Sequence, residues 1–291
     1  MREYLALTLR SNLGLAMKNS SMFPDSSTLL QERYRSATGE SSEPWDETIS
    51  LLLSHRSVRS YLPKALLPGT IETLVASAQS ASTSSNLQTW SVIAVEDPER
   101  KARLSELAGS QKHIVEAPLF LVWVADLSLL ESISERNKIS TDRLDNIEFL
   151  IMAVVDATLA AQNAFIALES LGLGGVYIGA IRNNTERVAA ELGLPSKAFP
   201  VFGLTVGYPD PSIVTEIKPR LPQAAILHRE QYSAVAIPAA VAEYDLLMRK
   251  FQAEQKLEVA DWSRQTAAKI NQVTGRDHLA EALHKLGFPL R

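Results

Sequence analysis

The alternation of apolar and polar residues along the chain predicts a mixture of strands and helices. Residues 117–125, APLFLVWVA, are almost continuously apolar, which is typical of a strand buried on both faces of a sheet. Shorter runs rich in β-forming residues, at 91–95, 176–178 and 201–206, predict further strands. The core therefore includes a sheet with at least one central strand.

Apolar spacing predicts more helix than strand. Residues 144–171 form a long helical pattern that is apolar around most of its circumference, so this helix is either central or packed against another subunit. Shorter helices are predicted at 46–53, 70–78 and 99–107 and from Thr185 onward. After Pro219 the chain is mainly helical, with 232–251 and 262–286 as the longest segments. This balance predicts an α+β or three-layer fold, not a doubly wound dinucleotide fold.

The first part of the chain differs in composition from the rest. Residues 20–43 are rich in serine and poor in large apolar residues, which is typical of a linker, and folded organisation is predicted to begin at Trp45. We therefore expect a poorly ordered or variable extension over residues 1–43 and one domain over residues 44–291.

Composition excludes several classes of function. A net charge of −4 is against a general nucleic-acid binder, because no strongly basic field is present to collect phosphates. The chain has no cysteine, and its five histidines show no close metal-ligand pattern, so no metal site is expected. By the sequence alone, we expect no apolar run to reach the length of a membrane span. We expect a cytoplasmic protein with neither a nucleic-acid partner nor a membrane partner.

The segment His55–Tyr61, HRSVRSY, is the first with clear chemical potential. It places three potential cations and two serine hydroxyls directly after an apolar run. Such a cluster cannot be buried without partners, so it faces either water or an anion. Arginine forks and serine hydroxyls suit phosphate oxygens. A solvated basic turn is the alternative that this segment alone leaves open.

Two more segments fit the same kind of ligand. Gly172-Leu173-Gly174-Gly175 follows a helix and precedes a strand, the reverse of a dinucleotide fingerprint, so it is either a helix cap or a place of close backbone approach to a flat group. Lys218-Pro219-Arg220-Leu221-Pro222 is a second basic cluster, which two prolines stiffen. Its alternative is an exposed connector with solvated cations.

Five segments in order resemble the nitroreductase superfamily, and most closely its oxygen-insensitive NADPH nitroreductase and flavin reductase group. They are HRSVRSY at 55–61, STSSNLQ at 82–88, QKH at 111–113, AQNAFIALESLGLGGVYIGAIRNN at 161–184 and KPRLP at 218–222. The resemblance implies an FMN enzyme with a central, mostly antiparallel sheet flanked by helices. It also implies a long helical C-terminal part and an intertwined homodimer.

The resemblance also implies which residues bind FMN. The cofactor-binding positions are His55, Arg56, Ser57, Val58, Arg59, Thr83, Ser84, Gln111, Tyr177, Ile178, Gly179, Ala180, Lys218 and Arg220. Among these, Lys218 and Arg220 match a pair that reaches the phosphate, Gln111 matches a hydrogen-bonding partner of the ring, and Arg59 is expected to tune the flavin. Ala180 stands where relatives often have glycine.

The implied activity is two-electron, ping-pong hydride transfer from NAD(P)H through FMN to a small acceptor such as a nitroaromatic, a quinone or free flavin. No catalytic side chain is expected, because hydride transfer demands no general base. Relatives hold the 2′-phosphate of NADPH with arginines where this chain has LLMRKFQAEQKLEVADW, so the choice between NADPH and NADH stays open. The alternatives are a specialised member of the superfamily (an ene-reductase, a dehalogenase or a biosynthetic oxidase) or a flavin-binding sensor.

Overall fold

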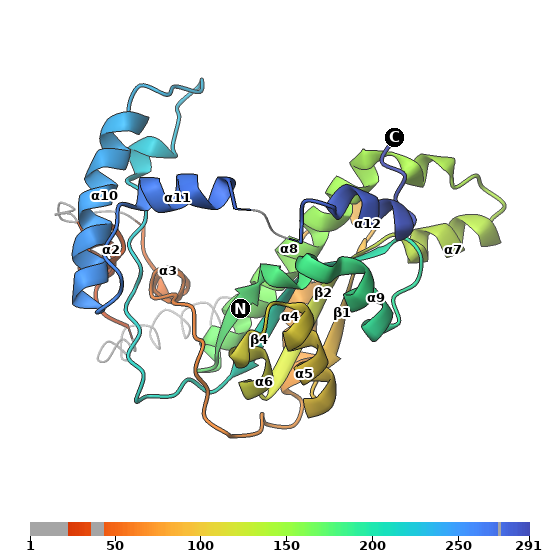
Figure 1. Ribbon diagram of the computed structural model, residues 1–291, viewed down its shortest axis with the longest axis horizontal. Coiled ribbons are helices and arrows are strands. Elements are labelled where there is room, and N and C mark those ends of the chain that lie inside the picture. The colour runs from red at the N-terminus through yellow and green to blue at the C-terminus, as the bar shows by residue number, and fades with distance from the viewer. Residues whose placement is uncertain (1–22, 36–43, 273–274) are drawn as a thin grey trace, which may run out of the picture. The chain divides into compact units, whose positions relative to one another are not determined.

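A computed structural model describes residues 23–35, 44–272 and 275–291, and these form two compact units (Figure 1). Unit 1 comprises residues 1–55 and 216–267, and unit 2 comprises residues 56–215 and 268–291. Residues 1–22 and 36–43 of the expected N-terminal extension lie outside the described residues, and the domain boundary at residue 44 stays a prediction.

Unit 2 is built on a four-stranded antiparallel sheet with the order β1-β2-β4-β3. The strands are β1 (Trp90–Val95), β2 (Leu119–Asp126), β3 (Gly174–Ile178) and β4 (Ala198–Gly207). Strand β2 is central and buried along nearly its whole length, which confirms the strand predicted from its continuous apolar run. Strand β3 lies at an edge of the sheet.

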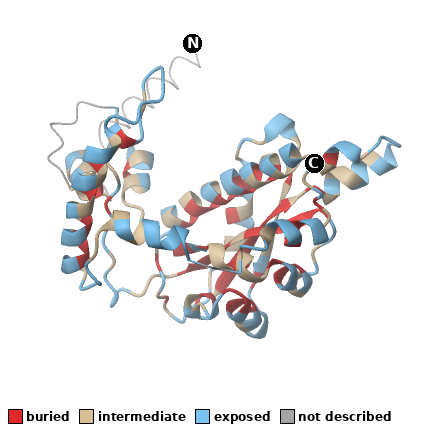
Figure 2. Ribbon diagram, turned by 45° about the horizontal axis from the view of Figure 1, so that its top comes forward, coloured by how far each residue is buried: buried red, intermediate tan, exposed pale blue. Residues whose placement is uncertain are grey.

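Helices cover both faces of this sheet, because successive side chains of β2 point to opposite faces. Leu119, Leu121 and Trp123 face a core formed with α4 (Thr70–Gln79) and α8 (Ile147–Ser170). Phe120, Val122 and Val124 face a second core, formed with α5 (Pro98–Leu107), α6 (Lys112–Glu116) and α9 (Thr185–Leu192). Burial is concentrated along the strands and the inward sides of the helices (Figure 2). The predicted α+β class is confirmed.

Close packing requires a glycine in β4. A Cβ atom at Gly203 would overlap the ring of Phe120, which stands on the neighbouring strand β2. Any larger residue would force the ring or the strand to move, and overpacked cores are commonly destabilised by about 1–3 kcal/mol.

Helix α8 presents mainly alanines to the core along its middle, and the larger Phe165 and Leu168 nearer its C-terminal end. Ala153, Ala157, Ala160, Ala161 and Ala164 are buried, which lets the helix approach the sheet closely. By length and composition alone α8 is long and apolar enough to cross a membrane, so the expectation that no segment reaches that length is wrong. In its most apolar window, 44% is buried inside the protein.

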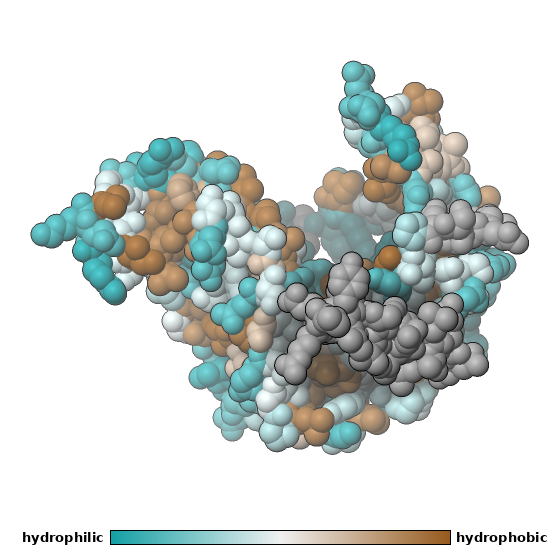
Figure 3. Space-filling model, turned by 180° about the vertical axis from the view of Figure 1, so that it is seen from behind, coloured by the Kyte–Doolittle hydropathy of each residue, from teal (hydrophilic) through white to brown (hydrophobic). Residues whose placement is uncertain are grey.

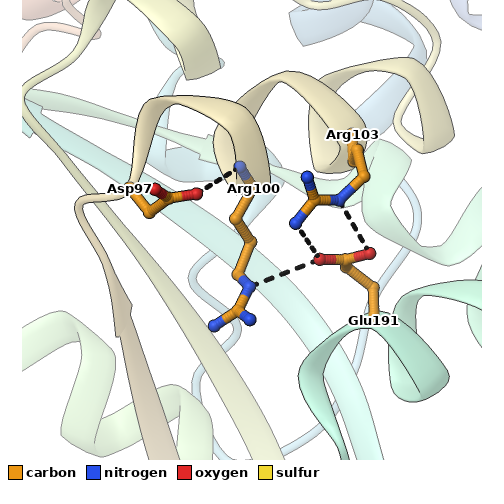
Figure 4. A network of polar contacts seen from close by, with 4 residues as sticks. All are labelled: Asp97, Arg100, Arg103 and Glu191. Carbon is orange, nitrogen blue, oxygen red and sulfur yellow. Dashed lines mark hydrogen bonds and ion pairs between the residues drawn. The ribbon is translucent and has the colours of Figure 1, made fainter.

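A surface ion-pair network joins α5 to α9 (Figure 4). Arg103 donates two hydrogen bonds to the Glu191 carboxylate, at 3.0 and 2.9 Å, and Arg100 donates a third at 3.3 Å. The hydrogen bond from Arg103 is the main reason that the pKa of Glu191 is lowered. Asp97 caps α5 by accepting from the Arg100 amide at 2.7 Å.

The remaining helices correct three expectations. The linker expected over 20–43 is wrong for residues 26–34, which form α2 (Ser26–Tyr34). The single helix expected over 262–286 is two helices, α11 (Trp262–Ile270) and α12 (Leu279–Lys285). Helix α10 (Ile237–Glu254) begins later than residue 232, with a proline in its first turn. Helix α3 (Glu47–Leu53) forms as predicted, and α7 (Ser128–Arg136) was not predicted.

Candidate functional site

The basic segment 56–61 is fixed to the sheet by its main chain. The Val58 amide donates to the Gly175 carbonyl at 2.9 Å, and Tyr61 forms a β-bridge with Pro209. Val58 is buried against Gly174, where a Cβ atom would overlap the valine side chain. Gly174 therefore serves close packing against a valine side chain, which the two interpretations of the glycine cluster did not include. Gly172 follows the end of α8 with a left-handed backbone, as the helix-cap interpretation expects. Arg56 and Arg59 are exposed on this fixed segment.

The buried hydroxyl of Tyr61 locks the same segment in place. It donates to the Val58 carbonyl at 2.7 Å and shares a hydrogen bond with Thr205 Oγ1 at 2.6 Å. Thr205 Oγ1 in turn accepts from the Val176 amide at 3.2 Å. Burial raises the pKa of Tyr61, so the hydroxyl stays protonated at neutral pH and remains able to donate a hydrogen bond.

Strand β3 offers an open edge next to this segment. The Gly175 carbonyl faces away from β4, because it accepts from Val58. Backbone groups alternate in direction along a strand, so the amide and carbonyl of Tyr177 also face the open side. The Tyr177 ring packs on Phe165 and Phe202, with centroids 5.1 and 5.2 Å away. The predicted residues Tyr177, Ile178, Gly179 and Ala180 all follow this edge into the turn after β3.

Arg59 acts electrostatically on helix α6. The pKa of His113, a residue of α6, is lowered mainly by burial and then by the positive charge of Arg59. The predicted residue Gln111 is the N-cap residue of the same helix, and its carbonyl accepts from Ser105 Oγ at 2.9 Å. Both predicted residues therefore bear on α6: Gln111 begins this helix, and the charge of Arg59 acts on His113 within it.

Ser84, next to Thr83, is held by a residue that sequence reasoning missed. The Asp156 carboxylate accepts from the Ser84 amide at 3.0 Å, and from the amide and hydroxyl of Thr89 at 3.2 and 2.9 Å. Asp156 is only 1% exposed, on the otherwise apolar inner face of α8. The one feature of the sequence that could have pointed to Asp156 was the presence of an acidic residue among the apolar residues of this long helix. The turn that it holds has left-handed backbone at Ser85, Asn86 and Gln88.

Unit 1 brings together the predicted residues His55, Lys218 and Arg220. Ile217 and Pro219 are buried whereas Lys218 and Arg220 are exposed, so both cations stand on the same side of an extended segment. The Tyr244 hydroxyl donates to the Pro219 carbonyl at 2.8 Å. Arg33 donates to the carbonyls of Lys218 and His55, both at 3.1 Å. No sequence pattern pointed to Arg33, because this residue lies in the serine-rich stretch.

In the described part of the chain, no group of three or more His, Asp or Glu residues could hold a metal ion. In the same part, neither Arg56 nor Arg59 forms an ion pair. Two cations without carboxylate partners on a rigid segment suit an anionic ligand.

Comparison with known proteins identifies the family. The model of the nitroreductase family matches residues 52–208, and that of the nitroreductase family C-terminal domain matches residues 218–291. The chain belongs to the nitroreductase family. The resemblance drawn from the five segments is confirmed.

Several relatives of this nitroreductase cover it at substantial identity. The oxygen-insensitive NADPH nitroreductase of Salmonella typhimurium is 37% identical over 84% of this chain and 99% of its own length. The FMN reductase (NADPH) of Bacillus subtilis is 43% identical over 65% of this chain and 75% of its own. Among solved structures, the NADPH:FMN oxidoreductase of Vibrio harveyi complexed with NAD+ superposes with a TM-score of 0.76 at 32% identity, covering 84% of this chain and 100% of that one.

We expect the Arg59→Ala variant to raise the pKa of His113, because removing a nearby positive charge makes the imidazole easier to protonate. The value should stay below the ordinary 6.5, since burial persists. A pH titration of the His113 ring signals by NMR measures it. Arg56→Ala is the matched control and should leave the His113 titration unchanged. An unaltered His113 pKa in Arg59→Ala would show that Arg59 points away from α6.

Proposed function

We propose that this nitroreductase is an FMN-dependent NAD(P)H oxidoreductase that reduces small electron acceptors such as nitroaromatics, quinones or free flavin. The observation that carries the proposal is the pair of exposed cations, Arg56 and Arg59, on a segment hydrogen-bonded to the open edge of β3. Family membership supports it, and relatives are named FMN reductase, NADPH nitroreductase and NADPH-flavin oxidoreductase.

The residues present fit FMN. Its phosphate needs cations and hydroxyls, which segment 56–61 supplies. Its flat ring carries polar edges that match the outward amide and carbonyl of Tyr177. Gly179 follows at the same edge, without a Cβ atom to keep a ring at a distance.

Each group of residues has its own proposed role. The phosphate is proposed to be bound by five residues: His55, Arg56, Ser57, Lys218 and Arg220. Thr83 and Ser84 offer their side-chain hydroxyls on the turn that Asp156 holds through the Ser84 amide, and Gln111 hydrogen-bonds the polar edge of the ring. The last group lies along the ring and its sides: Val58, Tyr177, Ile178, Gly179 and Ala180.

When bound, FMN supplies the chemistry, accepting a hydride from the nicotinamide and passing two electrons to the acceptor. The residues of the chain bind and orient this cofactor and tune how readily it is reduced. With FMN bound, the positive charge of Arg59 would stabilise negative charge on the ring and so favour the reduced cofactor. Donor and acceptor use the same open side in turn, and this gives ping-pong kinetics.

The nicotinamide is proposed to be NADPH, as in the names of several relatives. In this chain Arg249 lies in the stretch where relatives hold the 2′-phosphate, and it is paired with Asp261 at 3.2 Å. The next residue, Lys250, is an exposed cation. A comparison of kcat/KM tests the preference, and equal values for NADPH and NADH would remove any claim of 2′-phosphate recognition.

The homodimer is proposed from the outer face of α8. Ile147, Ile151, Val155 and Leu159 recur every fourth residue and are 44–51% exposed. Such a continuous apolar stripe is typical of a surface that another subunit covers. Figure 3 shows hydrophobic surface gathered in patches on the side of the protein that it displays.

A cytoplasmic location is proposed from the absence of cysteine, and cell fractionation tests it.

We expect the purified protein to show flavin absorption and to oxidise NADPH with menadione or nitrofurazone as acceptor. The Arg56→Ala variant should bind FMN about tenfold or more weakly, the effect of losing a charge-assisted hydrogen bond. Arg187→Ala, on the exposed side of α9, is the control and should retain FMN. A yellow protein without turnover would support a sensor instead, and a protein that binds no FMN would contradict the proposal.

We expect the Ile151→Glu variant to shift the protein from dimer to monomer, because the carboxylate would be buried without a partner. Sedimentation velocity measures the shift. Arg187→Glu reverses a charge on α9, which covers the opposite face of the sheet from α8, and should leave the dimer intact. A monomeric wild-type protein at all concentrations would contradict the proposed dimer.

A further inference from the structure

Helix α2 lies outside both family matches, which begin at residue 52 and resume at residue 218. It is nevertheless an ordered part of unit 1. Asp25 caps its first turn by accepting from the Thr28 amide at 3.1 Å, and Leu29 is fully buried. The helix packs against α3, at whose end the first basic segment begins.

The guanidinium of Arg33, near the end of α2, binds two separate segments of main chain. It donates to the carbonyls of Leu53 and His55, at 2.6 and 3.1 Å, and to the carbonyl of Lys218 at 3.1 Å. The Arg33 carbonyl accepts from the Arg220 amide at 3.0 Å. One residue therefore contacts the main chain at His55, Lys218 and Arg220, three of the predicted phosphate-binding residues.

The burial of Arg33 makes these contacts hard to replace. Arg33 is only 6% exposed, and a buried charge needs hydrogen bonds to offset its lost hydration. A guanidinium presents five N–H donors in a fixed, planar arrangement, so it can reach several carbonyls at once. A lysine ammonium presents its donors from a single point and cannot reproduce this geometry.

The result is that these cations stand on main chain that is fixed before a ligand arrives. Tyr244 binds the Pro219 carbonyl, while Arg33 binds the residues on both sides of Pro219. The Arg220 guanidinium also donates to the carbonyls of Lys218 and Pro219, at 3.3 and 3.4 Å. Pre-organisation of this kind strengthens binding by lowering its entropic cost.

We propose that Arg33 is a positioning residue for the phosphate of FMN, and that α2 is a cofactor-retention element which this chain carries ahead of the family fold. The inference rests on the proposed function, because it assumes that His55, Lys218 and Arg220 bind the phosphate. Its specific content is that α2 acts on phosphate recognition and leaves ring recognition to other residues.

A comparison of FMN with riboflavin tests this division, because riboflavin has the same ring and no phosphate. Dissociation constants for both flavins are measured by fluorescence on the full-length protein after removal and re-addition of flavin. The variants are Arg33→Met, which removes the donors at similar length, and Arg33→Lys, which keeps the charge. Arg35→Met is the matched control: its residue follows the same helix and forms an ion pair with Glu254 at 3.2 Å.

We expect Arg33→Met to weaken FMN binding by about tenfold or more, with riboflavin affinity changed by less than about twofold. Arg33→Lys should show a smaller loss of the same selectivity, and Arg35→Met should match the wild type. If Arg33→Met fails to fold, the dissociation constants of Arg33→Lys for FMN and riboflavin test the inference in the same way.

Two outcomes would overturn the inference: unchanged FMN affinity in the Arg33 variants, or an equal loss of affinity for both flavins, which would indicate a general structural role. The proposed function fails separately, if the wild-type protein binds neither flavin.

Discussion

The hydroxyl group of Tyr61 connects segment 56–61, strand β3 and strand β4 within unit 2. It donates to the Val58 carbonyl and shares a hydrogen bond with Thr205, whose hydroxyl oxygen also accepts from Val176. Buried polar groups must find partners, so this arrangement fixes the backbone on which Arg56 and Arg59 stand. The cations themselves remain in water, where they are available to a ligand. The proposed chemistry depends on this separation of a buried, hydrogen-bonded main chain from exposed charged side chains.

In unit 1, a different residue fixes the main chain that carries the exposed cations. There the buried guanidinium of Arg33 and the hydroxyl of Tyr244 hold the carbonyls of segment 218–220, while Lys218 and Arg220 stay exposed. Asp156 extends the principle to the turn at Ser84, where a buried carboxylate binds backbone amides. In all three places a buried polar side chain fixes main chain, and the residues proposed to meet FMN are the neighbours of the fixed atoms. Mutations at the buried residues should therefore act on cofactor binding without touching the cofactor.

The sequence predicted the elements whose periodicity is strong and missed those that depend on tertiary contacts. The apolar run of β2 and the long pattern of α8 sufficed to place a central strand and its covering helix. Helix α2 was missed because Leu29 is its only buried apolar residue and polar residues dominate its sequence. The break between α11 and α12 was missed because both flanking segments have helical patterns. The five ordered segments identified the family. No local pattern could reveal Arg33 as an anchor, and an acid among the apolar residues of α8 marked Asp156 without showing its partners, because the partners of both residues lie far away in the sequence.

A crystal structure of the protein grown with FMN is the most direct measurement of where the fixed cations point. We expect the phosphate within hydrogen-bonding distance of Arg56, Lys218 and Arg220, the ring along the open edge of β3 at Tyr177, and the hydrogen bonds of Tyr61 and Arg33 unchanged. A phosphate that faces solvent, or a ring bound away from β3, would contradict the view that these anchored segments form the cofactor site.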